Sequence, residues 1–494
     1  MAVSFNNIPS NIRVPLFYAE VDNSMANTAT ADLKTLLVGQ MTAEGKATAG
    51  QPVLVSSDSI GKELFGRGSV LALMNSAYRE NDTYGEVWAI PVEDPTGGAK
   101  ASGTFTITGE ATATGSVYAY IGAERVMVNV AIGDDAATIA TNLAAAINAK
   151  LDLPVTAAAE EGIVTLNAKN AGTWGNDIHL TVNLQGYAAG ESDPEGIGIT
   201  VAGMSGGTGV PDLSGVVTAM GDEAYDFIAM PYNDITSLDT FKTAMNDVSG
   251  RWSPMSQIYG HVYSAMRGTV SALQAFGAVR NDQHATIIGI EPDVPSLAVE
   301  ILGAFTARCA RSILNDPARP LQTLELIGIT PAAEGSRFTL SEKQTLLTSG
   351  IATTYTAGGY MRIERAITTY QTNAFGDADN SYLDSETLHT LAYIIRSLKT
   401  AITSKYNRHK LANDGTRYGS GQAVVTPSVI RGELIAQYAK LEARAIVEDA
   451  SRFADNLIVE RNATDPNRVD VLLPPDLVNG LRIFAVLTQF RLQY

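Results

Sequence analysis

One serine in the sequence stands in a pattern that some hydrolases use to present a catalytic nucleophile. Gly203-Met204-Ser205-Gly206-Gly207 matches the G-x-S-x-G motif, in which a sharp turn between a strand and a helix exposes the serine. That turn requires a helix to begin at once, whereas Thr208-Gly209-Val210-Pro211 follows here. The Gly-rich composition of residues 186–211 is typical of a flexible connection, and no Gly-Lys-Ser/Thr follows that would make a phosphate-binding loop. We therefore expect a linker here, and keep a serine hydrolase using Ser205 as an alternative.

The residues that most often bind metal ions are scattered along the chain. Asp377-Ala378-Asp379-Asn380-Ser381 is similar to the start of a calcium loop, but Tyr382 and Leu388 stand where that loop needs Gly and Glu. Cys309 is the only cysteine, which excludes an intrachain disulfide and a Cys-based metal site. We expect no catalytic residue, no metal and no cofactor. The histidines show no ligand spacing, and we expect His389 in the core or at the surface; the five are His179, His261, His284, His389 and His409.

Charge is distributed unevenly over the 494 residues, which carry a net charge of −17. Residues 1–200 have a net charge of −12, whereas residues 391–445 have nine Lys and Arg against three acidic residues. So acidic a chain repels phosphate, and we expect no nucleic-acid partner. The basic segment fits either a solvated helix face or a docking surface for another acidic protein. The N-terminus lacks the pattern of a signal peptide, and no apolar run is long enough to span a membrane.

The elements that would position any functional residue lie in two stretches, residues 26–95 and 210–340, where predicted strands alternate with predicted helices. Continuous apolar runs typical of buried parallel strands lie at residues 33–38, 86–92, 226–231 and 285–290. Helical patterns lie at residues 58–79, 237–247, 262–275 and 295–315, and a short strand is expected at 255–259. Strands that alternate with helices predict a parallel sheet with helices on both faces, which is an α/β core domain.

Residues 96–209 interrupt this alternation. They are rich in Thr, Gly, Val and Ala, and period-two alternation predicts strands at residues 104–109, 118–121, 126–130, 163–166 and 178–182. One helix is expected at residues 135–150, with Ile139, Leu143 and Ile147 on its apolar face. We expect a compact, mostly β domain inserted into the α/β domain, with a return linker at its end.

Residues 341–467 predict an α+β C-terminal domain. A short helix at residues 341–349 precedes a strand at 359–367. A second helix should begin at Thr426-Pro427, a favoured pair for a cap and a first turn. Apolar stripes mark the long helix before it and this helix; they comprise Leu388, Leu391, Ile395, Leu398 and Ile402, and Ile430, Leu434, Tyr438, Leu441 and Ala445.

The two ends of the chain, residues 1–25 and 468–494, read as extended arms. Pro9 and Pro15 exclude a helix in the first arm. The last strand, residues 481–494, is apolar on both faces. A strand of this kind needs burial on both sides, and at a sheet edge it would attract other strands.

The whole sequence resembles the contractile phage tail sheath proteins, and is most similar to the sheaths of Mu-like phages. The resemblance covers nearly the full chain and is most specific at residues 338–347 and 363–370 (FTLSEKQTLL and IERAITTY). Weaker matches lie in residues 5–15, in residues 120–126 and 140–144 of the inserted domain, and in the C-terminal helix pair with the final strand.

The resemblance implies a structural, non-enzymatic subunit that polymerises as six-fold rings around the tail tube and contracts during genome delivery. It implies a subtilisin-like core without protease activity, an inserted domain that projects outward, and a C-terminal domain that faces the tube. Partners would be other sheath subunits, the tube protein, and the baseplate and terminator proteins, with assembly in the host cytoplasm and residence in the virion. A tube-like or capsid protein is the structural alternative.

Under this resemblance each arm adds a strand to a sheet of a neighbouring copy. The arm residues expected in these contacts are Ile12, Val14, Leu16, Tyr18, Ile483, Phe484, Val486, Leu487 and Phe490. The basic residues expected to face the tube are Arg396, Lys399, Lys405, Arg408, Lys410, Lys440 and Arg444.

Overall fold

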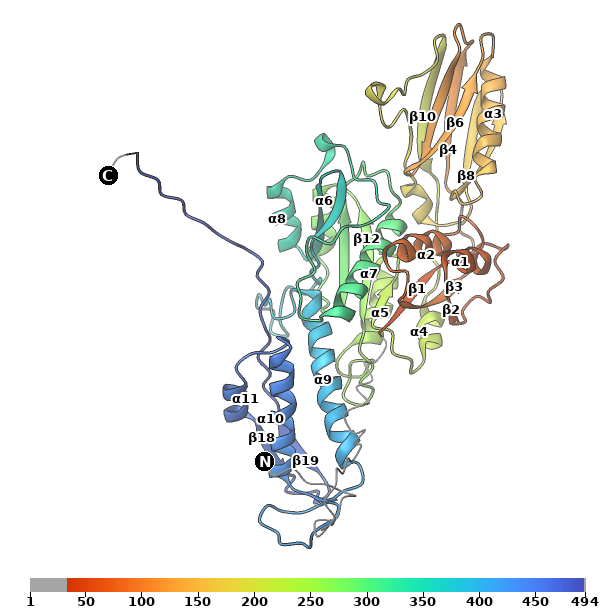
Figure 1. Ribbon diagram of the computed structural model, residues 1–494. Helices are drawn as coiled ribbons and strands as arrows, with labels where there is room; N and C mark the ends of the chain where they lie inside the picture. The colour runs from red at the N-terminus through yellow and green to blue at the C-terminus, as the bar shows by residue number, and fades with distance from the viewer. Residues whose placement is uncertain (1–32, 493–494) are drawn as a thin grey trace, which may run out of the picture.

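The computed structural model describes residues 33–492, and its centre is an eight-stranded sheet (Figure 1). The strand order is β15-β14-β13-β12-β11-β1-β3-β2. All neighbours are parallel except the edge pairs β14–β15 and β2–β3. The strands are β1 (Lys34–Gln40), β2 (Val53–Leu54), β3 (Glu86–Val92), β11 (Phe227–Ala229), β12 (His261–Arg267), β13 (Ala285–Ile290), β14 (Ile351–Ala357) and β15 (Tyr360–Arg365).

Helices bury both faces of this sheet, as its continuous apolar strands require. Successive residues such as Leu36 and Leu37 belong to different cores, one on each face. One face is covered by α2 (Val70–Asn81) and α7 (Ala298–Asn315), which pack closely against each other. The other face is covered by α4 (Ser214–Met220), α5 (Ile235–Met245), α6 (Val270–Ala278) and α8 (Leu340–Thr348). The predicted parallel α/β sheet is therefore present.

Three predictions in this core are wrong. The helix expected at residues 58–79 is two helices, α1 (Asp58–Phe65) and α2, because Gly66 and Gly68 take positive φ angles of 81° and 76° between them. Residues 255–259 form no strand, and the helix expected at 262–275 is instead β12 followed by α6. The sequence His-Val-Tyr-Ser-Ala-Met-Arg is apolar enough on both sides to sit between β11 and β13, so burial in the sheet overrides its helical pattern.

The inserted segment forms two sheets and one helix, α3 (Ala136–Ala149). Its four-stranded sheet has the order β10-β4-β8-β7 and its three-stranded sheet the order β6-β5-β9. The linker predicted at residues 186–211 is partly wrong, because β10 pairs with β4 along most of its length. The strands are β4 (Ser102–Gly109), β5 (Gly115–Ile121), β6 (Glu124–Val130), β7 (Val155–Glu160), β8 (Ile163–Ala168), β9 (Leu180–Val182) and β10 (Ile197–Ser205).

The C-terminal unit is built on two long helices, α9 (Ser385–Tyr406) and α10 (Pro427–Ala443), with α11 (Ala450–Asn456) beside them. Two small sheets accompany them, β16 (Lys410–Leu411) with β17 (Val424–Val425), and β18 (Ile458–Arg461) with β19 (Val469–Leu472). Both predicted helices are present, but Ile394 is buried in the α9 stripe where Ile395 was expected. The central sheet continues through β14 and β15, past residue 340, where we expected the C-terminal domain to begin.

The molecule is elongated, with the inserted sheets at one end and the C-terminal helices at the other (Figure 1). The last residues leave the body beside α10 and extend away from it as an isolated segment (Figure 1). The residues of the first expected arm, Ile12, Val14, Leu16 and Tyr18, lie outside the described part of the chain.

Candidate functional site

Ser205 lies at the exposed end of β10, in a setting that does not activate a nucleophile. The backbone N–H of Gly207 donates to Asn176 Oδ1 at 2.8 Å, so the glycines after Ser205 fasten the strand end to the inserted domain. The next α-helix, α4, begins only at Ser214. The strand–turn–helix geometry of a nucleophile elbow is therefore absent at this serine.

His389 and His261 are buried in the core and act as packing residues. His389 stacks on Phe227 with ring centroids 4.7 Å apart, and its Nε2 lies 3.1 Å from the hydroxyl of Tyr263. His261 Nε2 lies 2.8 Å from Thr286 Oγ1. Burial lowers the pKa of His389 to about 3 and that of His261 well below its usual value, so both rings are neutral at pH 7. The prediction that His389 lies in the core or at the surface is confirmed, in favour of the core.

The acidic loop at residues 377–381 uses its carboxylates to close its own turn. Asp379 accepts hydrogen bonds from the backbone N–H of Ser381 at 2.9 Å and from the hydroxyl of Tyr370 at 2.7 Å. Hydrogen bonds from Ser381 and Tyr370 lower the pKa of Asp379. Within residues 33–492, no group of three or more His, Cys, Asp or Glu side chains is placed to hold a metal ion.

The crevice where a doubly wound sheet usually binds ligands is filled by the chain itself. The strand order reverses between β1 and β11, and ligands bind outside the carboxyl ends of the strands at such a point. Gln40 ends β1 there, and its side-chain amide donates to Ala171 O at 2.7 Å and to Asp94. The hydroxyl of Tyr232, which follows β11, contacts Gln40 Oε1 at 3.4 Å. The inserted domain is therefore seated where a substrate would otherwise bind.

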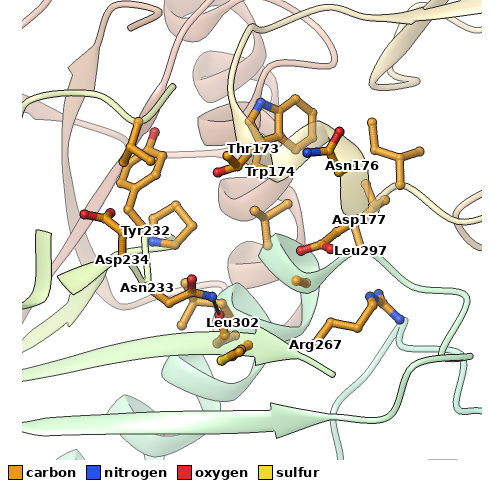
Figure 2. Close-up of a pocket in the computed structure, with 17 residues that line it drawn as sticks. Thr173, Trp174, Asn176, Asp177, Tyr232, Asn233, Asp234, Arg267, Leu297 and Leu302 are labelled. Atoms are coloured by element: carbon orange, nitrogen blue, oxygen red, sulfur yellow. Dashed lines mark hydrogen bonds between the residues drawn. The ribbon is translucent and has the colours of Figure 1, made fainter. Parts of the chain in front are cut away.

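A small cavity remains between the inserted domain and the central sheet, beside the contacts of Gln40 (Figure 2). Its volume is about 290 Å³, and the segment Thr173–Asp177 forms one wall while Asn233, Asp234 and Arg267 form another. Burial raises the pKa of Asp177, and the nearby Arg267 opposes this rise. The guanidinium of Arg267 donates to Val294 O at 2.6 Å and Ser296 O at 2.7 Å, which fixes the loop before α7. The cavity wall contains no Ser, Cys or His.

The basic residues of the C-terminal helices divide into paired and exposed ones. Arg396 donates to the buried carboxylate of Asp226 at 2.6 Å, and thereby ties α9 to the central sheet. Lys405 pairs with Glu433 on α10 at 2.7 Å. Lys399 donates to Gln257 Oε1 at 2.9 Å, and the guanidinium of Arg444 contacts the hydroxyl of Tyr393. In the described part of the chain, Arg408, Lys410 and Lys440 are exposed and form no ion pair.

The C-terminal segment exposes an unusual amount of apolar side chain. Residues Ile483 to Leu492 form no strand with any described residue of their own chain. Soluble monomers seldom expose apolar side chains so densely, and patches of this kind mark interaction sites. The side chains that we expected in subunit contacts are Ile483, Phe484, Val486, Leu487 and Phe490, with relative exposures of 81%, 83%, 67%, 84% and 79%.

Comparison with known proteins identifies the family of this chain. The family model for the central domain of the phage tail sheath protein matches residues 206–369, and the model for the phage tail sheath C-terminal domain matches residues 377–491. The chain is 41% identical over 493 residues to the tail sheath protein of the Mu-like prophage FluMu of Haemophilus influenzae, covering 99% of this chain and 100% of that protein. This chain belongs to the phage tail sheath family.

A solved sheath structure shares the fold. The crystal structure of the sheath tail protein from Desulfitobacterium hafniense matches this sheath subunit with a TM-score of 0.50 at 11% identity, over 95% of this chain and 97% of that one. The protein is therefore a structural component of a phage or prophage tail, located in the virion, and not an enzyme. None of the helices in residues 33–492 has the length and apolar character needed to cross a membrane.

Sequence reasoning missed two parts of the sheath subunit that bear on its arms. The first is the β18–β19 hairpin: β19 lies within residues 468–494, which we expected to leave the subunit as an arm, but it pairs with β18 of its own chain. A signal existed in Ile458 and Val459 after the helix, but the strand is only four residues long. The second is the ion pairing of Arg482 with Asp384 and Glu386, which no local pattern indicates because it joins residues about a hundred positions apart.

Proposed function

We propose that this sheath subunit polymerises as six-fold rings stacked around a tail tube, and that the array contracts to drive the tube through the host envelope during genome delivery. The observation that carries the proposal is the apolar C-terminal segment, which extends from the body with exposed side chains from Ile483 to Leu492. A strand that is apolar on both faces gains stability only when it is covered on both faces. In a homopolymer the nearest cover is another copy of the same chain.

The β18–β19 hairpin supports a role as the acceptor of such a strand. It is an antiparallel sheet of only two strands, so both outer edges lack a strand partner among residues 33–492. Ile458, Val471 and Leu472 on the hairpin are 51%, 42% and 60% exposed. A two-stranded hairpin is marginally stable in water, and added strands supply main-chain hydrogen bonds. We propose that the C-terminal arm of one neighbour and the N-terminal arm of another complete this sheet.

Arm contacts that are individually weak can hold the array together because they are repeated in every subunit. Each main-chain hydrogen bond contributes about 0.5–1.5 kcal/mol net, so one short added strand holds modestly. Two arms for each subunit, repeated through a lattice, hold strongly because every later contact forms within an existing assembly. The bodies can then rotate as rigid units while the arms keep neighbours joined, and the extended array can relax to a contracted one without a nucleotide.

Charge supports an orientation of the subunit in the array. The exposed cations Arg408, Lys410 and Lys440 lie on the C-terminal unit, whereas the inserted domain at the far end belongs to the acidic half of the chain. We propose that the C-terminal unit faces a tube protein with acidic groups and that the inserted domain faces solvent. Tube, baseplate and terminator proteins are the proposed partners besides other sheath subunits, with assembly in the host cytoplasm.

Electron microscopy of the purified protein tests the proposal. Negatively stained recombinant protein should form wide hollow cylinders with helical striations in the absence of tube protein. A variant that ends at Gly480 should remain a folded monomer and form no cylinders. Narrow tubes, closed shells, or cylinders formed equally well by the truncated variant would contradict the proposal.

A further inference from the structure

The segment that joins the β18–β19 hairpin to the C-terminal arm contacts its own subunit at several residues. The backbone N–H of Asp476 donates to the hydroxyl oxygen of Tyr438 at 3.0 Å, and Val478 N–H donates to Ile446 O at 3.4 Å. Gly480 lies so close to Pro320 that a Cβ on the glycine would sit 2.5 Å from Pro320 Cγ. These contacts hold the chain in place up to the residue before the arm.

The last fastening is a clamp of charged side chains at Arg482. Its guanidinium lies 3.3 Å from Asp384 Oδ1 and forms an ion pair with Glu386. Arg365 holds Asp384 from the other side with two hydrogen bonds of 2.8 and 3.0 Å. The side chains of Arg482 and Glu386 are only 16% and 8% exposed, so the pair is shielded from water and resists screening by salt. Breaking one partner of a buried pair leaves an uncompensated charge, which makes the clamp hard to open.

The clamp sits far from the subunit's own hairpin. Asp384 and Glu386 stand at the first turn of α9, the end of the helix that packs on the central sheet through His389. The hairpin is joined to the opposite end of the helix pair, where Arg431 near the start of α10 donates to Leu457 O beside β18. The stretch of α10 between Arg431 and its final turn spans about 20 Å at 1.5 Å per residue. The arm therefore starts about one helix length away from the hairpin that its own chain carries.

The free part of the arm is long enough to reach that hairpin if the chain at Arg482 could rotate. An extended chain reaches about 3.3–3.6 Å per residue, so the residues from Ile483 to Leu492 reach roughly 30 Å. About 20 Å of this reach would be used in crossing to the hairpin, so the last few residues of a freely turning arm could pair with the hairpin of its own subunit. That pairing would satisfy the same main-chain groups and remove the subunit from assembly.

We propose that the Arg482 clamp is a positioning device that fixes the direction in which the arm leaves the body. It keeps the arm off the β18–β19 hairpin of its own chain and presents it to a neighbouring copy. The inference rests on the proposed function, because it assigns a role to the clamp in arm exchange.

The test measures assembly of full-length protein and the folding of the dilute monomer side by side. Arg482→Ala should raise the protein concentration at which cylinders first appear by tenfold or more in light scattering and microscopy. Arg482→Lys, which keeps the charge but loses the forked geometry, should give an intermediate rise. Arg311→Ala removes an exposed arginine of α7, outside the arm and the hairpin, and is the matched control; its onset should stay within twofold of the wild type.

Hydrogen exchange of the monomer separates positioning from a general loss of stability. In dilute Arg482→Ala, amides at the outer edges of β18 and β19 and in the last arm residues up to Leu492 should become better protected than in wild type as the arm folds back. Unchanged onset together with unchanged exchange would overturn the inference. Should Arg482→Ala unfold, Glu386→Gln weakens the same clamp with little change in shape and must raise the onset; if it does not, the inference is wrong.

Failure of the proposed function gives a different result. Wild-type protein would then form no cylinders at any concentration. The exchange measurement on the monomers would still decide whether the clamp holds the arm away from the hairpin.

Discussion

His389 shows how the titratable residues of this sheath subunit are used. It lies in the first part of α9, between Phe227 and Tyr263 of the central sheet, and so joins the C-terminal unit to the core. Arg396, two turns further along α9, makes a second connection through Asp226. Both residues have chemistry that an enzyme could use, but here each is occupied by a contact between two elements.

The neutral state of His389 predicts a specific pH dependence of stability. Burial lowers its pKa from 6.5 to about 3, so between these values the unfolded chain takes up a proton that the folded chain does not. The free energy of unfolding should therefore fall by about 1.4 kcal/mol per pH unit for this one group as the pH drops below 6.5. His389→Gln, which keeps a hydrogen-bonding group for Tyr263, removes this contribution.

Urea unfolding at two pH values measures the effect. Between pH 7.5 and pH 5, wild type should lose about 2 kcal/mol more than His389→Gln. His261 is present in both proteins, so its own titration cancels in the comparison. Equal losses in the two proteins would show that His389 is not held neutral by its surroundings.

For single residues, the sequence predicts local turns better than distant contacts. The glycines and Pro211 after Ser205 favoured a connection over a nucleophile elbow, with a hydrolase kept as the alternative. The pairs Arg396–Asp226 and Arg482–Glu386 could not be found, because an ion pair between residues about a hundred or more positions apart leaves no local pattern.

The helices α2 and α7 pack in close contact on one face of the central sheet. Gly303 of α7 faces α2 so closely that a Cβ would lie 2.4 Å from Met74 O, a backbone atom that cannot move aside by rotation. The absence of a side chain at Gly303 therefore sets the distance between the two helices.

Gly303→Ala should destabilise the subunit by about 1–3 kcal/mol, because the added methyl forces α7 away from α2. Gly215 in α4 is the matched control, since nothing lies within 4 Å of a Cβ built there. Gly215→Ala should be neutral or stabilising by up to about 1 kcal/mol, as expected for a helical position. Thermal unfolding of the two variants checks the contrast, and equal effects would contradict this account of the helix packing.

Elements with strong periodicity could be predicted, and those shaped by tertiary contacts could not. Residues 86–92 and 285–290 were predicted as strands at the bounds of β3 and β13, because their apolar runs are continuous. β12 was taken for a helix because its residues suit either element when buried on both sides, and only its neighbours β11 and β13 decide. β10 was taken for a linker because its glycines mask its alternation, and only its pairing with β4 makes it a strand.

The whole molecule combines an acidic inserted domain and a basic stretch at residues 391–445 with an apolar segment that its own body does not cover. The exposed cations on the C-terminal unit suit long-range attraction to an acidic partner, which sets orientation and association rate more than final affinity. The apolar arm suits short-range pairing with copies of the same chain.

Reversing charge at two exposed positions tests the proposed orientation. Arg408→Glu combined with Lys440→Glu should lower co-sedimentation of the sheath with purified tail tubes at least fivefold at low salt, and the deficit should shrink at high salt. Lys100→Glu, an exposed lysine at the base of the inserted domain, is the control and should have little effect. Unimpaired co-sedimentation of the double variant would show that this surface does not face the tube.

The most direct test of the central claim is a reconstruction of the assembled cylinder by electron cryo-microscopy, followed along one chain from Arg482 to Phe490. In the assembled lattice, Ile483 to Phe490 should form a strand hydrogen-bonded to the sheet of an adjoining subunit, with side chains buried on both faces. Density that traces these residues onto the β18–β19 hairpin of their own subunit, or leaves them uncovered in the lattice, would contradict it.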